Sequence, residues 1–80
     1  MIEELRCNDK IVGLKQTIRA IEGGHAKKAF LSKDCAPHIF NEIEHNCNKY
    51  KVPVEYVDTM SELGKVCGID VGAAVAVITK

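Results

Sequence analysis

The sequence predicts an α/β protein folded as a three-layer α/β/α sandwich, because helical and strand-like patterns of apolar residues alternate along the chain. Short apolar runs, the candidates for strands, occur at residues 11–12, 29–31, 52–57 and 73–78. The last run is unbroken, which is typical of a strand covered on both faces. With 80 residues, 46% of them hydrophobic and 28% charged, we expect one domain over residues 1–80 with a single core.

The first half of the chain predicts one well-defined helix between short strands. The expected elements are a short amphipathic turn or helix, a brief strand, a helix and a buried strand, at residues 2–7, 11–12, 15–22 and 29–31. Around the helix, Leu14, Ile18 and Ile21 recur at i, i+4 and i+7, which gives it one apolar face. The glycine pair at 23–24 ends the helix, as glycine commonly does at helix C termini.

The second half predicts two more helices and two strands. We expect a helix from Pro37 to about Tyr50, a strand over residues 52–57, a helix that begins after Thr59, and a strand over residues 73–78. Proline is favoured at the first position of a helix. Thr59-Met60-Ser61-Glu62 has the pattern of a capping box, which satisfies free backbone N–H groups at a helix start. Gly68 is expected to end this helix.

Charge is distributed unevenly, although the net charge is zero. Residues 10–33 hold six basic side chains against one acid, and residues 34–62 hold six acids against two lysines. A chain polarised in this way can turn a basic face toward phosphates, whereas its zero net charge argues against nonspecific binding of polyanions. The alternative is that both blocks are solvated surface.

The N-terminal residues are acidic and no long apolar span follows them, so we expect neither a secretory signal nor a transmembrane helix. The expected location is the cytoplasm, where the four cysteines at positions 7, 35, 47 and 67 would be free thiols. Cys47 and Cys67 fall on apolar helical faces, which predicts that they are buried.

Cysteine and histidine spacing gives little support for a metal site or for thiol catalysis. Cys35-x-x-His38 and His45-x-Cys47 offer four candidate zinc ligands, but the two histidines stand about two helical turns apart. The chain has no Cys-x-x-Cys motif and no glycine-rich loop of the phosphate-binding type. We expect no metal, no cofactor and no catalytic residues, which leaves a small thiol or metal enzyme as the weakest alternative.

Three polar side chains gather at the start of the helix expected over residues 15–22, off its apolar face. Backbone N–H groups are free at a helix start, and the helix dipole makes it positive. Lys15 can donate to guanine O6 and N7, the Gln16 amide can pair with a base edge, and Arg19 can reach a phosphate. These residues are therefore candidates for nucleic-acid binding. The alternative is the solvated face of an amphipathic helix.

The loop Gly68-Ile69-Asp70-Val71-Gly72 places two apolar residues between two glycines, just after a helix. One interpretation is a tight turn in which Ile69 and Val71 help to close the core, because glycine often serves turns for backbone reasons alone. The other is an exposed apolar surface, which would suit an unstacked base.

Two motifs resemble the L7Ae/L30e family of small ribosomal proteins that bind kink-turn RNA, and most closely its bacterial single-domain members. The first is Gly-x-Lys-Gln-Thr-x-Arg at 13–19, and the second is Leu-Gly-x-x-Cys-Gly-Ile-Asp-x-Gly-Ala-Ala at 63–74. The likeness extends from Lys10 to Ile78. The resemblance implies that the sheet of the sandwich is mixed and four-stranded.

The resemblance also implies a binding site. The start of the first helix would enter the widened groove beside tandem sheared G·A pairs, and the 68–72 loop would hold the nucleotide expelled from the bulge. The RNA-binding residues expected on this basis, together with a lysine near the glycine pair, are Gly13, Leu14, Lys15, Gln16, Arg19, Lys28, Gly68, Ile69, Asp70, Val71 and Gly72. Some family members carry Asn-Glu where this chain has Lys15-Gln16, and archaeal relatives carry a basic residue at the position of Gly23.

The expected function is therefore non-catalytic binding of structured RNA that contains a kink-turn, in ribosomal RNA or in another RNA. We expect a monomer that binds neither DNA nor membranes. The main alternative is a protein-interaction module on the same fold, because the family also contains members that bind proteins. Loss of the polar residues at the helix start would mark such a module, and this chain retains them.

Overall fold

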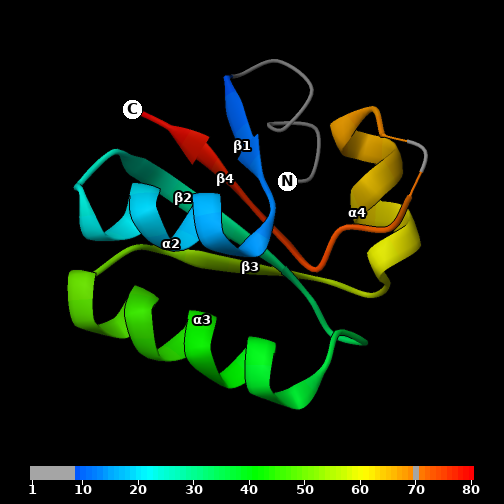
Figure 1. The fold of residues 1–80 in the computed structure, drawn as a ribbon, viewed down its shortest axis with the longest axis horizontal. Coiled ribbons are helices and arrows are strands. Elements are labelled where there is room, and N and C mark those ends of the chain that lie inside the picture. The colour runs from blue at the N-terminus through cyan, green and yellow to red at the C-terminus, as the bar shows by residue number, and fades with distance from the viewer. Residues whose placement is uncertain (1–8, 70) are drawn as a thin grey trace.

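A mixed four-stranded sheet with strand order β1-β4-β2-β3 runs through the centre of the fold (Figure 1). The computed structural model describes residues 9–69 and 71–80, so the turn or helix expected at 2–7 lies outside the described residues. The strands are β1 (Lys10–Val12), β2 (Ala26–Ser32), β3 (Val54–Val57) and β4 (Val75–Thr79). β2 and β3 are parallel, whereas β4 is antiparallel to both β1 and β2.

Helices cover both faces of this sheet. α2 (Leu14–Glu22) and α3 (Pro37–Tyr50) lie on one face, and α4 (Met60–Cys67) lies on the other (Figure 1). Side chains alternate between the two layers, so Ala29 and Leu31 pack toward α2 and α3 while Phe30 packs toward α4. All three are fully buried. The predicted α/β/α sandwich with a mixed four-stranded sheet is confirmed.

Two strands begin later than their apolar runs suggest, β3 at Val54 and β4 at Val75. The backbone N–H of Val52 donates to the Cys47 carbonyl at 2.8 Å, so this residue closes the end of α3. The N–H of Ala73 donates to the Met60 carbonyl at 3.0 Å, which ties the chain to α4 before the strand starts. In both places the backbone N–H is hydrogen-bonded to a helix carbonyl and is therefore not available for pairing with a neighbouring strand.

The helix boundaries follow their predicted signals. The Thr59 side chain accepts a hydrogen bond from the Glu62 N–H at 3.0 Å, as expected for a capping box. Gly68 ends α4 in the left-handed conformation at φ 78°, and Pro37 is the first residue of α3. None of the helices within 9–69 and 71–80 has the length and apolar character to cross a membrane.

The topology gathers four connections at one end of the sheet. β1 ends at Val12 opposite Ala76, Leu31 of β2 pairs with Val75, and Ser32 pairs with Val57. The segments that follow β1, β2 and β3 and the segment that precedes β4 therefore lie at the same end. We call this end the loop edge, and its described residues are Gly13 and residues 33–36, 58–59, 68–69 and 71–74.

Candidate nucleic-acid interface

Helix α2 begins at the loop edge without a side-chain cap. Its N-cap is Gly13, at φ 112° and ψ 154°, a conformation that disfavours residues with a side chain. A Cβ atom at this position would also lie 2.9 Å from Gln16 Oε1, so the Gln16 side chain folds back over the helix start. No acidic residue occupies the first turn. The positive end of the helix is therefore left for an external acceptor.

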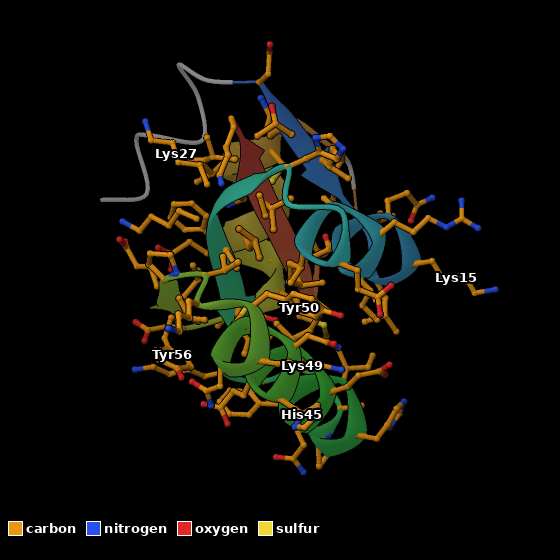
Figure 2. The ribbon with its side chains drawn as sticks, turned by 90° about the vertical axis from the view of Figure 1, so that its left-hand side faces the viewer. Lys15, Lys27, His45, Lys49, Tyr50 and Tyr56 are labelled. Atoms are coloured by element: carbon orange, nitrogen blue, oxygen red, sulfur yellow. The ribbon has the colours of Figure 1, made fainter. Side chains whose placement is uncertain are left out.

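The three predicted polar residues of α2 are exposed. Lys15, Gln16 and Arg19 face solvent, whereas Leu14 is half-buried and packs against the core. Figure 2 shows Lys15 projecting away from the body of the protein. Within the described part of the chain, neither Lys15 nor Arg19 has an ion-pair partner. Both cations are thus available to a ligand, while Leu14 anchors the helix start.

The 68–72 loop runs back along α4 and is fixed at both ends. The Ile69 N–H donates to the Gly64 carbonyl at 3.0 Å, and beyond the loop Ala73 is bonded to Met60. A Cβ atom on Gly64 would lie 2.2 Å from the Val71 carbonyl oxygen, closer than any real contact of this kind. Only glycine at position 64 therefore allows the loop to lie directly on the helix. The remaining predicted loop residue, Asp70, lies outside the described residues.

The loop exposes apolar side chains. Val71 is 71% exposed and Ile69 36%, which places them among the most exposed large hydrophobic side chains described. The interpretation of Val71 as a core residue is therefore wrong, because most of this residue is exposed to solvent. A fixed, exposed apolar side chain offers a surface on which an unstacked base can lie.

The two halves of the predicted site adjoin at the loop edge. The Gly13 N–H donates to the carbonyl of Val75 at 3.3 Å, and Val75 begins β4 three residues after the 68–72 loop. Side chains from the β2–α3 connection support this junction. The Ser32 hydroxyl donates to the Ala74 carbonyl at 2.8 Å, and Asp34 Oδ1 accepts from the Met60 N–H at 2.8 Å.

Sequence reasoning missed Ser32 and Asp34. The Asp34–Met60 bond joins residues 26 apart, so no local motif announces it. A serine at the end of an otherwise apolar strand was the one available signal, because a fully buried hydroxyl needs a partner.

Lys28 is the one described basic residue of the predicted site that lies outside α2, and the structure does not bring it to the loop edge. It pairs with Ile78 across the sheet, toward the opposite end from Val75. Its ammonium lies 2.7 Å from Glu55 Oε1 and 5.3 Å from the centre of the Phe30 ring, on the α4 face. The Lys28 ammonium holds the pKa of the Glu55 carboxyl below its ordinary value of 4.5. These contacts hold Lys28 on the α4 face, away from the loop edge.

We expect the variant Lys28→Ala to lose stability but not ligand affinity. The free energy of unfolding at pH 7 should fall by about 1 kcal/mol or less, since the ion pair is partly exposed. Because Glu55 has a lowered pKa in the folded state, the pair stabilises above pH 4.5 and its contribution fades as the pH falls below that value. Urea melts of both proteins at pH 7 and pH 3 measure this. A difference that persists unchanged at pH 3 would contradict the ion-pair assignment.

The three described cysteines are buried within the fold. Cys35, Cys47 and Cys67 are free and buried, and Cys7 lies outside the described residues. Burial raises the pKa of the Cys47 thiol to about 11, with a further contribution from the Glu44 carboxylate, and burial also raises that of Cys67. Thiols in this state are poor nucleophiles and poor ligands. Within 9–69 and 71–80, no three His, Cys, Asp or Glu side chains group closely enough to hold a metal ion.

Comparison with known proteins places this geometry in a family. The chain matches the ribosomal protein L7Ae/L30e/S12e/Gadd45 family over residues 4–80. It is 39% identical over 75 residues to an RNA-binding protein of Halalkalibacterium halodurans, and the aligned region covers 94% of this chain and 92% of that protein. It is 38% identical over 76 residues to the RNA-binding protein YbxF of Geobacillus stearothermophilus, and the aligned region covers 95% of this chain and 93% of that protein.

Two solved structures share the fold. A protein of unknown function from Bacillus halodurans C has a TM-score of 0.89 at 22% identity, over 99% of this chain and 83% of that one. The Giardia lamblia 15.5 kD RNA binding protein has a TM-score of 0.86 at 21% identity, over 99% of this chain and 68% of that one. The sequence matches and the shared fold agree, and the chain belongs to the ribosomal protein L7Ae/L30e/S12e/Gadd45 family.

Proposed function

We propose that this protein binds RNA at the loop edge and that its ligand is a kink-turn. The observation that carries the proposal is the junction of two unlike surfaces: an uncapped helix start with free cations and a fixed loop with Val71 71% exposed. The first suits phosphates and base edges, and the second suits a base that has left the stack. Family membership and relatives named as RNA-binding proteins support the same assignment.

In this proposal each residue has one task. Lys15 and Gln16 read base edges beside the tandem G·A pairs, and Arg19 holds a phosphate. Val71, with Ile69 beside it, packs against the expelled nucleotide. Gly13, Gly68 and Gly72 supply the backbone that brings these groups together.

The mechanism is binding without chemistry. The site fits bent RNA better than extended RNA, and this difference in affinity is what shifts the RNA toward its kinked form. The target is ribosomal RNA or another structured RNA of the cytoplasm. Binding isotherms with a kink-turn oligonucleotide, and with one whose G·A pairs are replaced by Watson–Crick pairs, test the proposal. We expect tight binding of the first only, and equal affinity for both would overturn it.

The variants Lys15→Ala and Gln16→Ala should each weaken binding of the kink-turn without unfolding the protein. The loss of a base contact is expected to cost about 1–3 kcal/mol, which is about a 5- to 150-fold increase in Kd. Both side chains are exposed, so the melting temperature should hardly change.

Lys27→Ala is the matched control for these two variants. Lys27 is equally exposed, but Figure 2 shows it on the opposite side of the molecule from Lys15. If Lys27→Ala weakens binding as much as Lys15→Ala does, general charge accounts for affinity and the base-reading assignment is wrong.

A further inference from the structure

A pocket of about 550 Å³ lies beside α2 and extends beyond the residues of the proposed interface. Gln16 and Arg19 form part of its lining, so it is continuous with the surface that we assign to RNA. Ile11 of the edge strand β1 and Ala20 of α2 add apolar surface, and His25 lies where the chain leaves α2. The volume falls within the range of about 300–1,000 Å³ that is typical of small-ligand sites.

The backbone fixes His25 in this pocket. Its N–H donates to the Ala20 carbonyl at 2.9 Å, and its own carbonyl accepts from the Lys80 N–H at 2.8 Å. The imidazole then folds back against the end of α2, because Gly23 leaves room for it. A Cβ atom on Gly23 would lie 3.0 Å from His25 Cδ2 and 3.1 Å from the Arg19 carbonyl oxygen. The ring is therefore held against the C-terminal end of α2, the helix that carries Arg19.

The chemistry of the pocket matches a nucleotide. Imidazole rings and guanidinium groups both stack on bases, and Arg19 can also pair with a phosphate. The described residues that line the pocket include no Asp or Glu, so no lining side chain repels a phosphodiester. The half-buried side chain of Ile11 offers apolar surface to the face of a base, whereas Ala20 is only 4% exposed.

We infer that this pocket holds a further nucleotide of the bound RNA, in the strand that continues along α2 beyond the kink. The inference rests on the proposed function, because the RNA must already be bound at the loop edge. The base lies against Ile11 beside the His25 ring, and its phosphate lies near Arg19. The RNA contact surface then extends along α2 from Gln16 to His25.

The experiment compares affinities for a kink-turn RNA that has a full stem on each side of the kink. We expect His25→Ala to raise Kd by about fivefold or more, which is what the loss of one stacked base costs. His25→Phe keeps an aromatic face and should restore an affinity within about twofold of the unmodified protein. His45→Ala is the matched control, since His45 is an exposed histidine on α3 (Figure 2), and it should not change Kd.

A second measurement covers the case in which a variant fails to fold. In the unmodified protein, the His25 ring resonances should shift when this RNA is added, and those of His45 should not. Affinity of His25→Ala within twofold of the unmodified protein, or His25→Phe as weak as His25→Ala, would overturn the inference. If the unmodified protein does not distinguish the kink-turn from the RNA with replaced G·A pairs, the proposed function fails and this inference fails with it.

Discussion

The variant Val71→Asp should lose most of its affinity for kink-turn RNA and keep its stability. Val71 is 71% exposed, so the substitution removes little packing, and we expect the free energy of unfolding to change by about 0.5 kcal/mol or less. In the complex, the new carboxylate would face an expelled base and the negative backbone around it. Like charges placed together across an interface cost several kcal/mol, so Kd should rise by at least about tenfold.

Thermal melts and binding isotherms on the same samples separate the possible results. Asn48→Asp is the matched control, because it adds the same charge at an exposed position of α3. Collapse of stability in Val71→Asp would mean that the loop belongs to the core after all. Unchanged affinity would mean that the loop does not touch the RNA. Ile69→Asp should lower both affinity and stability, since Ile69 is only 36% exposed.

The variant Gly64→Ala should lose both stability and RNA affinity. In most helices a glycine-to-alanine substitution stabilises by up to about 1 kcal/mol. Here the added Cβ would lie 2.2 Å from the Val71 carbonyl oxygen, a backbone atom that moves only if the whole loop moves. Overpacking of this kind costs about 1–3 kcal/mol, and the displaced loop would no longer present Val71 to the RNA.

Ser61→Ala provides the control for Gly64→Ala, because it adds no bulk at an exposed position on the same helix. We expect it to leave stability and Kd close to those of the unmodified protein. Denaturant melts and isotherms measure both quantities. A Gly64→Ala protein that is as stable as the parent and binds RNA as well would show that the loop does not depend on its close approach to α4.

The sequence predicts the fold well because its signals are local. The capping box at Thr59, Pro37 at the first turn of α3 and the glycine at position 68 each act within a few residues, and each marks a boundary that the structure confirms. The starts of β3 and β4 are less predictable. Those boundaries depend on hydrogen bonds to α3 and α4, which an apolar run in the sequence does not reveal.

The candidate site also has a part that local sequence signals predict and a part that depends on residues far away in the sequence. Helical periodicity alone places Lys15, Gln16 and Arg19 off the apolar face, and the structure exposes all three. The basic surplus of residues 10–33 does not form one face, because Lys15 and Lys27 lie on opposite sides (Figure 2) and Lys28 is paired with Glu55. Whether a lysine is paired depends on its neighbours in the sheet, and those lie far away in the sequence.

The central claim is that Lys15 and Gln16 recognise the G·A pairs of a kink-turn, and a protein–RNA double-mutant cycle tests it most directly. Kd is measured for the unmodified protein and for the Lys15→Ala/Gln16→Ala double variant, each with kink-turn RNA and with RNA whose G·A pairs are replaced. We predict a coupling energy of at least about 1 kcal/mol, because the protein change should matter only where its RNA partners are present. A coupling energy near zero, with the double variant weakened equally on both RNAs, would contradict the account.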